Sequence, residues 1–220
     1  MRVVIAGGHG QIALLLEKRL ADAGHDPVAL VRNPDHERDV HAVGATPVVL
    51  DLESASVTDV THVLQGADAV VFAAGAGPGS TAERKETVDR AGAVLLADAA
   101  SAAGVARYVM VSSMGTEKAD PTSDDVFQGY LRAKAAADAD LRGRSDLVWT
   151  IVRPGRLTDD SPTGHVTVGA SLPSGSIPRA DVADVLLSVL ESPAADRRQF
   201  DVVAGDTPVR DAVASLISLG

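Results

Sequence analysis

The chain has 220 residues, a formal net charge of −10 and 45% hydrophobic residues, a composition that suits a globular protein and excludes collagen-like and disordered chains. It contains no cysteine, which excludes disulfides, zinc–thiolate sites and a catalytic thiol. The acidic balance and the lack of a basic run argue against nucleic-acid binding, because phosphate contacts need Lys or Arg.

The N-terminus and the hydropathy pattern indicate the compartment. Met1 is followed directly by a short β-branched run and a glycine turn, without the apolar stretch of a signal peptide. No run of about 18 apolar residues suggests a membrane span. We therefore expect a cytoplasmic protein that binds no membrane. The six histidines lack metal-ligand spacing, so no metal site is expected.

Apolar β-branched runs alternate along the chain with segments of helical periodicity, as in βαβ units around a parallel sheet. Strands are expected at residues 2–6, 27–32, 46–50, 69–73, 107–112, 147–152 and 199–203. Helices are expected at residues 11–24, 35–43, 55–65, 83–103, 127–142, 180–191 and 208–218. The pattern predicts an α/β protein, with residues 1–220 forming a single-domain Rossmann fold around a doubly wound, mostly parallel sheet.

Three segments interrupt this rhythm. Residues 75–81 are expected to form a glycine-rich loop, and residues 115–125 a polar loop. The Gly/Pro-rich stretch 154–178 is expected to hold at most a short strand near residues 166–168. The apolar residues expected to face the core include Leu14, Leu15, Leu20 and Trp149.

A glycine-rich turn, Gly7-Gly8-His9-Gly10, follows the first expected strand and opens the first expected helix. Glycines at this spacing let the backbone turn sharply and lie against a pyrophosphate at the helix N-terminus. The strand–turn–helix context is the one that this motif requires. His9 either touches a phosphate or points to water. The residues predicted to bind a dinucleotide here are Gly7, Gly8, His9, Gly10, Gln11 and Ile12.

The residues at the end of the second strand bear on the choice between NAD and NADP. An acid there would bind the ribose 2′-hydroxyl of NAD, but the sequence has Arg32 and Asn33. The planar cation of Arg32 matches a 2′-phosphate, so NADP(H) is favoured over NAD(H). The alternatives are that Arg32 is a solvated strand-end residue and that Asp35, nearby in the sequence, takes part.

The ends of the third and fourth strands lie at the same edge of the predicted sheet, where a doubly wound fold binds its ligand. Asp51 and Leu52 follow the third strand, and we expect adenine and ribose beside them. Asp51 fits a turn or helix cap equally well. The cofactor contacts expected after the fourth strand are Ala73, Ala74 and Gly75.

Tyr130 and Lys134 stand four residues apart on one expected helix and are therefore neighbours on its surface. An ammonium group near a tyrosine stabilises its phenolate, which lets the hydroxyl exchange a proton with a carbonyl or alcohol. Ser112 and Ser113 follow the fifth strand, where a hydroxyl can polarise the same carbonyl. The sequence leaves open which of the two serines faces the site.

With these motifs the chain resembles the short-chain dehydrogenases/reductases, and more closely their atypical NAD(P)H-binding branch near the NmrA-like and biliverdin reductase B-like proteins. The resemblance covers nearly the whole chain. The motifs that carry it are Gly7-x-x-Gly10-x-x-Ala13, Arg32, Asp51-Leu52, Val111-Ser112-Ser113, Tyr130-x-x-x-Lys134, Arg153-Pro154-Gly155 and Ile177-Pro178-Arg179-Ala180-Asp181-Val182-Ala183.

The resemblance implies roles for the residues of these motifs. Tyr130 is implied as the acid/base, and Lys134 as its electrostatic helper and ribose ligand. Ser113 or Ser112 is implied as the hydroxyl that polarises the carbonyl. Pro154 and Gly155 are implied to border the nicotinamide. The chain is too short for the C-terminal substrate domain of the extended members, so nucleotide-sugar epimerisation is not expected.

The expected function is that of an NADP(H)-dependent oxidoreductase acting on a small carbonyl or related electrophile. The alternative is a non-catalytic NADP(H)-binding redox sensor or regulatory protein, since some members of the branch bind the cofactor without turnover. The substrate is expected to contact residues 75–81, 114–127 and 155–176. The apolar residues expected in that pocket are Met114, Phe127 and Leu157. The protein is expected to be a monomer or a homodimer paired through its long helices.

Overall fold

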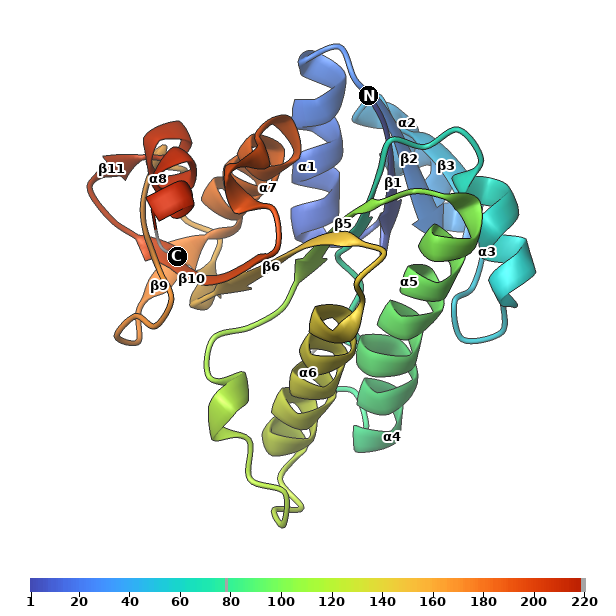
Figure 1. Ribbon diagram of the computed structural model, residues 1–220. Coiled ribbons are helices and arrows are strands. Elements are labelled where there is room, and N and C mark those ends of the chain that lie inside the picture. The colour runs from blue at the N-terminus through green and yellow to red at the C-terminus, as the bar shows by residue number, and fades with distance from the viewer. Residues whose placement is uncertain (78, 219–220) are drawn as a thin grey trace.

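The central sheet of the computed structural model, which describes residues 1–77 and 79–218, has the order β11-β8-β10-β6-β5-β4-β1-β2-β3 (Figure 1). All neighbouring strands pair in parallel except β8, which runs antiparallel to β10 and β11. The strands are β1 (Arg2–Ala6), β2 (Asp26–Val31), β3 (Thr46–Val49), β4 (Ala69–Phe72), β5 (Arg107–Val111), β6 (Val148–Pro154), β8 (His165–Gly169), β10 (Arg198–Ala204) and β11 (Thr207–Pro208). The predicted Rossmann-type α/β fold is confirmed.

Helices cover both faces of this sheet. Figure 1 shows α1 and α7 on one face and α3, α5 and α6 on the other. The helices are α1 (Gln11–Asp22), α2 (Glu37–Ala42), α3 (Val57–Leu64), α4 (Ala82–Arg84), α5 (Gly92–Ala103), α6 (Val126–Gly143), α7 (Arg179–Glu191) and α8 (Val209–Ser215). Short 3₁₀ turns lie at Pro34–His36, Thr116–Lys118, Pro193–Ala195 and Leu216–Ser218.

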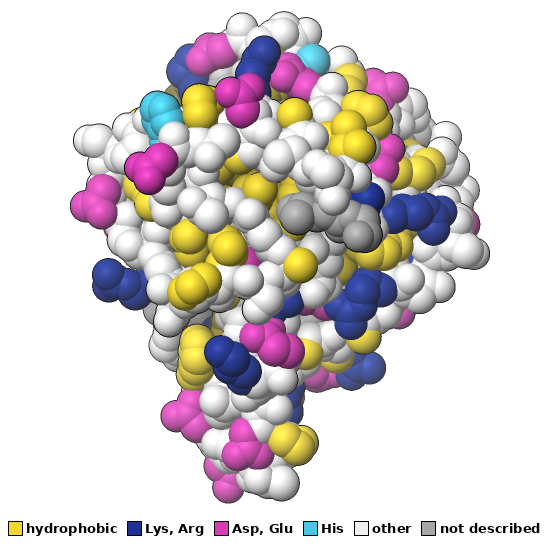
Figure 2. Space-filling model, turned by 60° about the vertical axis from the view of Figure 1, so that its left-hand side comes forward, with side chains coloured by type: hydrophobic (Ala, Val, Ile, Leu, Met, Phe, Trp, Pro, Cys, Tyr) yellow, Lys and Arg dark blue, Asp and Glu magenta, His cyan; other side chains and the backbone are white. Residues whose placement is uncertain are grey.

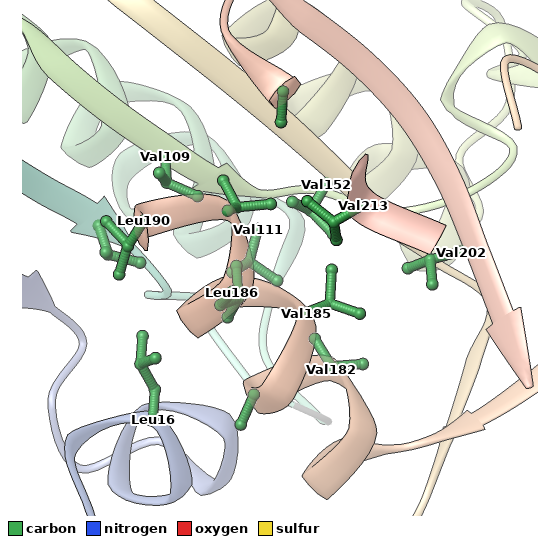
Figure 3. Packing of buried hydrophobic residues seen from close by; sticks show 14 of the residues in the cluster. Leu16, Val109, Val111, Val152, Val182, Val185, Leu186, Leu190, Val202 and Val213 are labelled. Carbon is green, nitrogen blue, oxygen red and sulfur yellow. The ribbon is translucent and has the colours of Figure 1, made fainter. Parts of the chain in front are cut away.

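The buried strands explain the continuous apolar runs of the sequence. Along β1, Val3 and Ile5 pack on the α1/α7 face, whereas Val4 and Ala6 pack on the α3/α5/α6 face. Both faces of a parallel sheet are covered by helices, so the residues pointing to either side are apolar. Figure 3 shows the hydrophobic cluster on the α1/α7 face from close by, with side chains of α1, α7 and the sheet pointing toward one another.

The first helix buries a slightly different face from the one predicted. Leu20 is fully buried as expected, and so is Leu16. Leu14 and Leu15 are only partly buried, because they lie at the sides of the stripe that faces the sheet. Trp149 packs against the hydrophobic cluster on the α3/α5/α6 face, as predicted.

The helix expected at 83–103 is interrupted. After the single turn of α4, the segment Lys85–Ala91 is π-helical, and α5 begins only at Gly92. A π-helical segment inserts an extra residue per turn and shifts the side chains that follow it around the helix axis. Such segments recur at functional sites. In this protein the π-helical segment determines where Lys85 and Asp89 lie relative to α6.

The stretch 154–178 holds more strand than predicted. The short strand expected at 166–168 lies within β8, but two further strands, β7 (Arg156–Thr158) and β9 (Ser176–Pro178), form a separate two-stranded parallel sheet. Their pairing joins residues about twenty apart, so no local pattern reveals it. The expected helix at 208–218 likewise begins after the two-residue strand β11 and ends in a 3₁₀ turn.

The two edges of the sheet are short strands that each contain a proline. Pro47 lies in β3, and Pro208 lies in β11. Leu50 donates its backbone N–H to Val31 O, and Val209 donates to Gly164 O. Since successive residues of a strand alternate between its two sides, the nitrogens of both prolines face away from the neighbouring strand.

Charged side chains of both signs are spread over the face in Figure 2. Its lower end, where the loop before α6 protrudes in Figure 1, is rich in Asp and Glu. That loop, residues 115–125, contains the exposed residues Glu117, Asp120, Asp124 and Asp125. Within residues 1–77 and 79–218, no helix is long and apolar enough to cross a membrane.

Candidate functional site

Two adjoining cavities lie at the carboxyl ends of the parallel strands. They share Ala73, Ala74, Gly75 and Gly77, which follow β4. The residues of the first cavity are Gly7, His9, Gly10, Leu30, Val31, Arg32, His36, Leu50, Asp51, Leu52, Glu53, Ala76, Arg84 and Val88, with the shared four. The residues of the second are Ile12, Gly79, Ser80, Lys85, Asp89, Val111, Ser112, Val126, Phe127, Tyr130, Lys134 and Leu157, with the same four.

The glycine turn forms one wall of the first cavity and fits a pyrophosphate. Gly7 has a φ of 82°, and a Cβ there would lie 2.5 Å from Ala74 Cα, so only glycine fits between the turn and the end of β4. Helix α1 begins after Gly10 without a side-chain cap and without an acid in its first turn. Its first N–H groups are therefore available to an anion in the cavity.

His9 is held by its neighbours at the rim of this cavity. Its Nε2 lies 3.0 Å from Asp39 Oδ2, and its ring stacks on that of His36 at a centroid distance of 3.6 Å. The hydrogen bond with His9, followed by that from Arg38, lowers the pKa of Asp39. Both His9 and His36 line the cavity. The contacts with Asp39 and His36 therefore orient the His9 imidazole, which does not simply point into water.

The far end of the first cavity carries two arginines that share one carboxylate. Arg84 Nη2 lies 2.9 Å from Glu53 Oε2, and Arg32 Nη1 lies 3.8 Å from the same oxygen. Thr87 donates a hydrogen bond of 2.7 Å to Glu53 Oε1 and fixes the carboxylate. The sequence predicted Arg32 but not Arg84 or Glu53, since neither of these belongs to a recognisable motif.

The side chain of Asp51 serves a turn, which is one of the two alternatives open from the sequence. Its Oδ1 accepts the N–H of Glu53 at 3.0 Å while the residue lines the cavity. Asn33 has a similar role, because its side chain accepts the N–H of Asp35 and caps a short 3₁₀ turn. Asn33 does not line either cavity.

Tyr130 and Lys134 both face the second cavity from α6. The Lys134 side chain is 4% exposed, and its Nζ lies 3.4 Å from Asp89 Oδ1. It also donates to Val111 O at 3.2 Å and to Ala74 O at 3.4 Å. The ammonium group therefore holds the ends of β4 and β5 together, and its charge is balanced by a buried carboxylate.

Asp89 was not predicted. It is fully buried on the π-helical segment, and its Oδ2 accepts the N–H of Ala76 at 3.0 Å. Its pairing with Lys134 depends on how the π-helical segment packs on α6, so sequence spacing contains no signal for it.

The structure separates the two serines. Ser112 is buried, lines the second cavity and donates a hydrogen bond of 2.9 Å to Asp138 Oδ2. Burial raises the pKa of Asp138 to about 6, against the hydrogen bond from Ser112, which lowers it. Ser113 donates instead to Met114 O and lines neither cavity. Of the two candidates, Ser112 is the one placed with Tyr130 and Lys134.

Several other predicted contacts lie outside the cavity walls. A Cβ on Gly8 would lie 2.5 Å from that of Ala29, so this glycine lets the turn pack on β2. A Cβ on Gly155 would lie 2.5 Å from Gly175 O, so this glycine permits a close backbone approach next to β7. The predicted site and pocket residues that line neither cavity are Gly8, Gln11, Asn33, Ser113, Met114, Pro154 and Gly155.

In the parts of the chain that the structure describes, no group of three or more His, Asp or Glu side chains is placed to hold a metal ion.

Comparisons with known proteins agree with this geometry. Residues 7–193 match the model of the NAD(P)H-binding family, and the chain belongs to that family. This family fits the resemblance of the sequence motifs to the atypical branch of the short-chain dehydrogenases/reductases. This chain is 33% identical to the uncharacterized sugar epimerase YhfK of Bacillus subtilis, over 98% of this chain and 100% of that protein. It is 34% identical to protein YMR090W of Saccharomyces cerevisiae, over 98% and 99% of the two chains.

Solved structures have the same fold. A Bacillus halodurans protein, named provisionally as an NAD-dependent epimerase/dehydratase, is 38% identical with a TM-score of 0.89 and coverage of 97% and 98%. The oxidoreductase ylbE from Lactococcus lactis is 27% identical with a TM-score of 0.88 and coverage of 99% and 97%. This chain is therefore a member of an NAD(P)H-binding, oxidoreductase-like family.

Proposed function

We propose that the protein is an NADPH-dependent oxidoreductase that reduces small carbonyl compounds or related electrophiles. The observation that supports this most directly is that the end of β4, residues 73–75, lines both cavities. A dinucleotide bound along this edge connects the glycine turn with the cavity of Tyr130, Lys134 and Ser112. The second cavity, at about 730 Å³, has the size of a small-molecule pocket.

The cofactor would be held by the residues of the first cavity. Gly7, Gly10 and the first turn of α1 suit its pyrophosphate, and Asp51 and Leu52 suit its adenosine. When bound, the dinucleotide supplies a hydride to the substrate.

The residues of the second cavity would supply the proton that the carbonyl oxygen of the substrate takes up. Tyr130 donates its hydroxyl proton to the carbonyl oxygen as negative charge develops there. The Nζ of Lys134 lies 6.0 Å from the centre of the Tyr130 ring, so its ammonium group is close to the phenol. When Asp138 is protonated, it can donate a hydrogen bond to the Ser112 hydroxyl. The Ser112 O–H is then free to donate a hydrogen bond to the substrate.

The preference for NADPH is assigned to Arg32. The protein is expected to bind NADPH several-fold more tightly than NADH, because the guanidinium matches the 2′-phosphate. Arg32→Ala is expected to remove most of that difference, and fluorescence titration of each nucleotide measures it. Arg210→Ala is the matched control, because Arg210 is exposed and outside the cavity. Equal affinities in the wild type, or an unchanged ratio in Arg32→Ala, would contradict the assignment.

The reductase activity is tested by following NADPH consumption with a panel of aldehydes, ketones, quinones and enones. We expect consumption above background with at least one class of compound. The alternative function, a cofactor-binding redox sensor, predicts tight NADPH binding with no consumption over the whole panel.

A further inference from the structure

The second cavity contains a lysine that the proposed mechanism does not require. Lys85 begins the π-helical segment and is 8% exposed. Its Nζ donates to Gly77 O at 2.9 Å and lies 5.3 Å from the centre of the Tyr130 ring. The lysine is thus fixed at the wall of the cavity and close to the expected reaction site.

The charges of the two cavity lysines are balanced differently. Lys134 pairs with Asp89, and Asp89 is also bound to the N–H of Ala76. Within residues 1–77 and 79–218, no carboxylate lies within 4.0 Å of Lys85 Nζ, and its hydrogen bond goes to a neutral carbonyl. An ammonium group has three donors, so two remain for a ligand. A buried cation without a counter-ion is costly, and an anion in the cavity would compensate it.

The rest of the cavity wall is mostly apolar. Ile12, Val111 and Leu157 line it, and Val126 and Phe127 lie on the same wall from the start of α6. Phe127 is 60% exposed, and its ring centre lies 6.0 Å from that of Tyr130. An exposed aromatic ring beside a cavity suits a flat apolar ligand.

We infer that Lys85 binds the carboxylate of an apolar carbonyl substrate, with the apolar body of the substrate against Phe127 and Leu157. That the ligand is a substrate rests on the proposed function. The carboxylate-binding subsite itself rests only on Lys85 and the cavity. A monocarboxylate is favoured over a phosphate because one cation is unbalanced and the surrounding wall is apolar. The cofactor phosphates belong to the glycine turn in the other cavity.

The binding test uses a matched pair of unreactive probes, 2-naphthoate and 2-naphthamide, with the NADP⁺-saturated full chain. Ligand-observed NMR titration measures both dissociation constants. We expect the wild type to bind 2-naphthoate about tenfold or more tightly than the amide. Lys85→Met should abolish this discrimination, Lys85→Arg should restore most of it, and the exposed Lys118→Met should leave it unchanged.

Two outcomes would overturn the inference. One is that Lys85→Met binds 2-naphthoate as tightly as the wild type. The other is that it loses NADPH affinity in fluorescence titration, which would assign Lys85 to the cofactor. Turnover is measured separately, with phenylglyoxylate and its methyl ester. Discrimination between the naphthalene probes without any turnover would support the carboxylate subsite while contradicting the reductase proposal.

Discussion

Tyr130→Phe is expected to lower the turnover of a reducible carbonyl by about 10²- to 10⁴-fold while leaving NADPH affinity nearly unchanged. The substitution removes the proton donor but keeps the ring that packs near Phe127 and the two lysines. The kcat under saturating substrate and the dissociation constant of NADPH measure the two effects.

The chain contains a matched control for this substitution, because it has two tyrosines. Tyr108 is fully buried in β5 and donates to Ala93 O, and burial raises its pKa far above the ordinary value. Tyr108→Phe removes the same hydroxyl from the core, so it should change stability and not kcat. If Tyr130→Phe is as active as the wild type, the proton comes from water and Tyr130 is not the donor.

Glu17→Gln is expected to change how stability depends on pH. Glu17 is fully buried in α1, and both its oxygens lack a hydrogen-bond partner within the described residues. Burial raises its pKa to about 8. Between about pH 4.5 and pH 8 the folded protein keeps this proton while the unfolded chain has lost it. The contribution of Glu17 to the free energy of unfolding therefore falls by about 1.4 kcal/mol per pH unit across this window.

An amide at position 17 cannot ionise, so this slope disappears in the variant. The difference in free energy of unfolding, variant minus wild type, should rise by about 1.4 kcal/mol per pH unit from pH 5 to pH 8. Urea denaturation of both proteins at pH 5, 6.5 and 8 measures it, and the contribution of Asp138 cancels in the difference. Glu86→Gln, at an exposed position on the π-helical segment, should leave the wild-type curve unchanged. Parallel curves for Glu17→Gln and the wild type would refute a buried proton.

The glycine turn shows what the sequence can predict about this site. Strand, turn and helix are adjacent in the chain, so their joint pattern alone predicts that Gly7, Gly10 and the ends of β2 to β4 lie at one edge of the sheet. Tyr130 and Lys134 are predicted to be neighbours for the same reason, because helical spacing is local.

The contacts of Lys85, Asp89 and Asp138 show what the sequence cannot predict. Each depends on how two helices, or a helix and a strand end, are packed across the fold. The π-helical segment adds a rotation that helical periodicity does not contain. The assignment of Ser112 instead of Ser113 has a similar origin, since side-chain alternation along β5 is not fixed beyond the strand end.

The prolines at the two edges of the sheet affect how copies of this chain can associate. A strand that docked on β3 or β11 would meet a position with no N–H to donate and a pyrrolidine ring in its path. Each edge strand is also short, with four residues in β3 and two in β11. Continuous sheets across two subunits, and runaway edge-to-edge aggregation, are thereby disfavoured. We therefore expect any association between copies of this chain to use surfaces other than these edges, such as the helical faces.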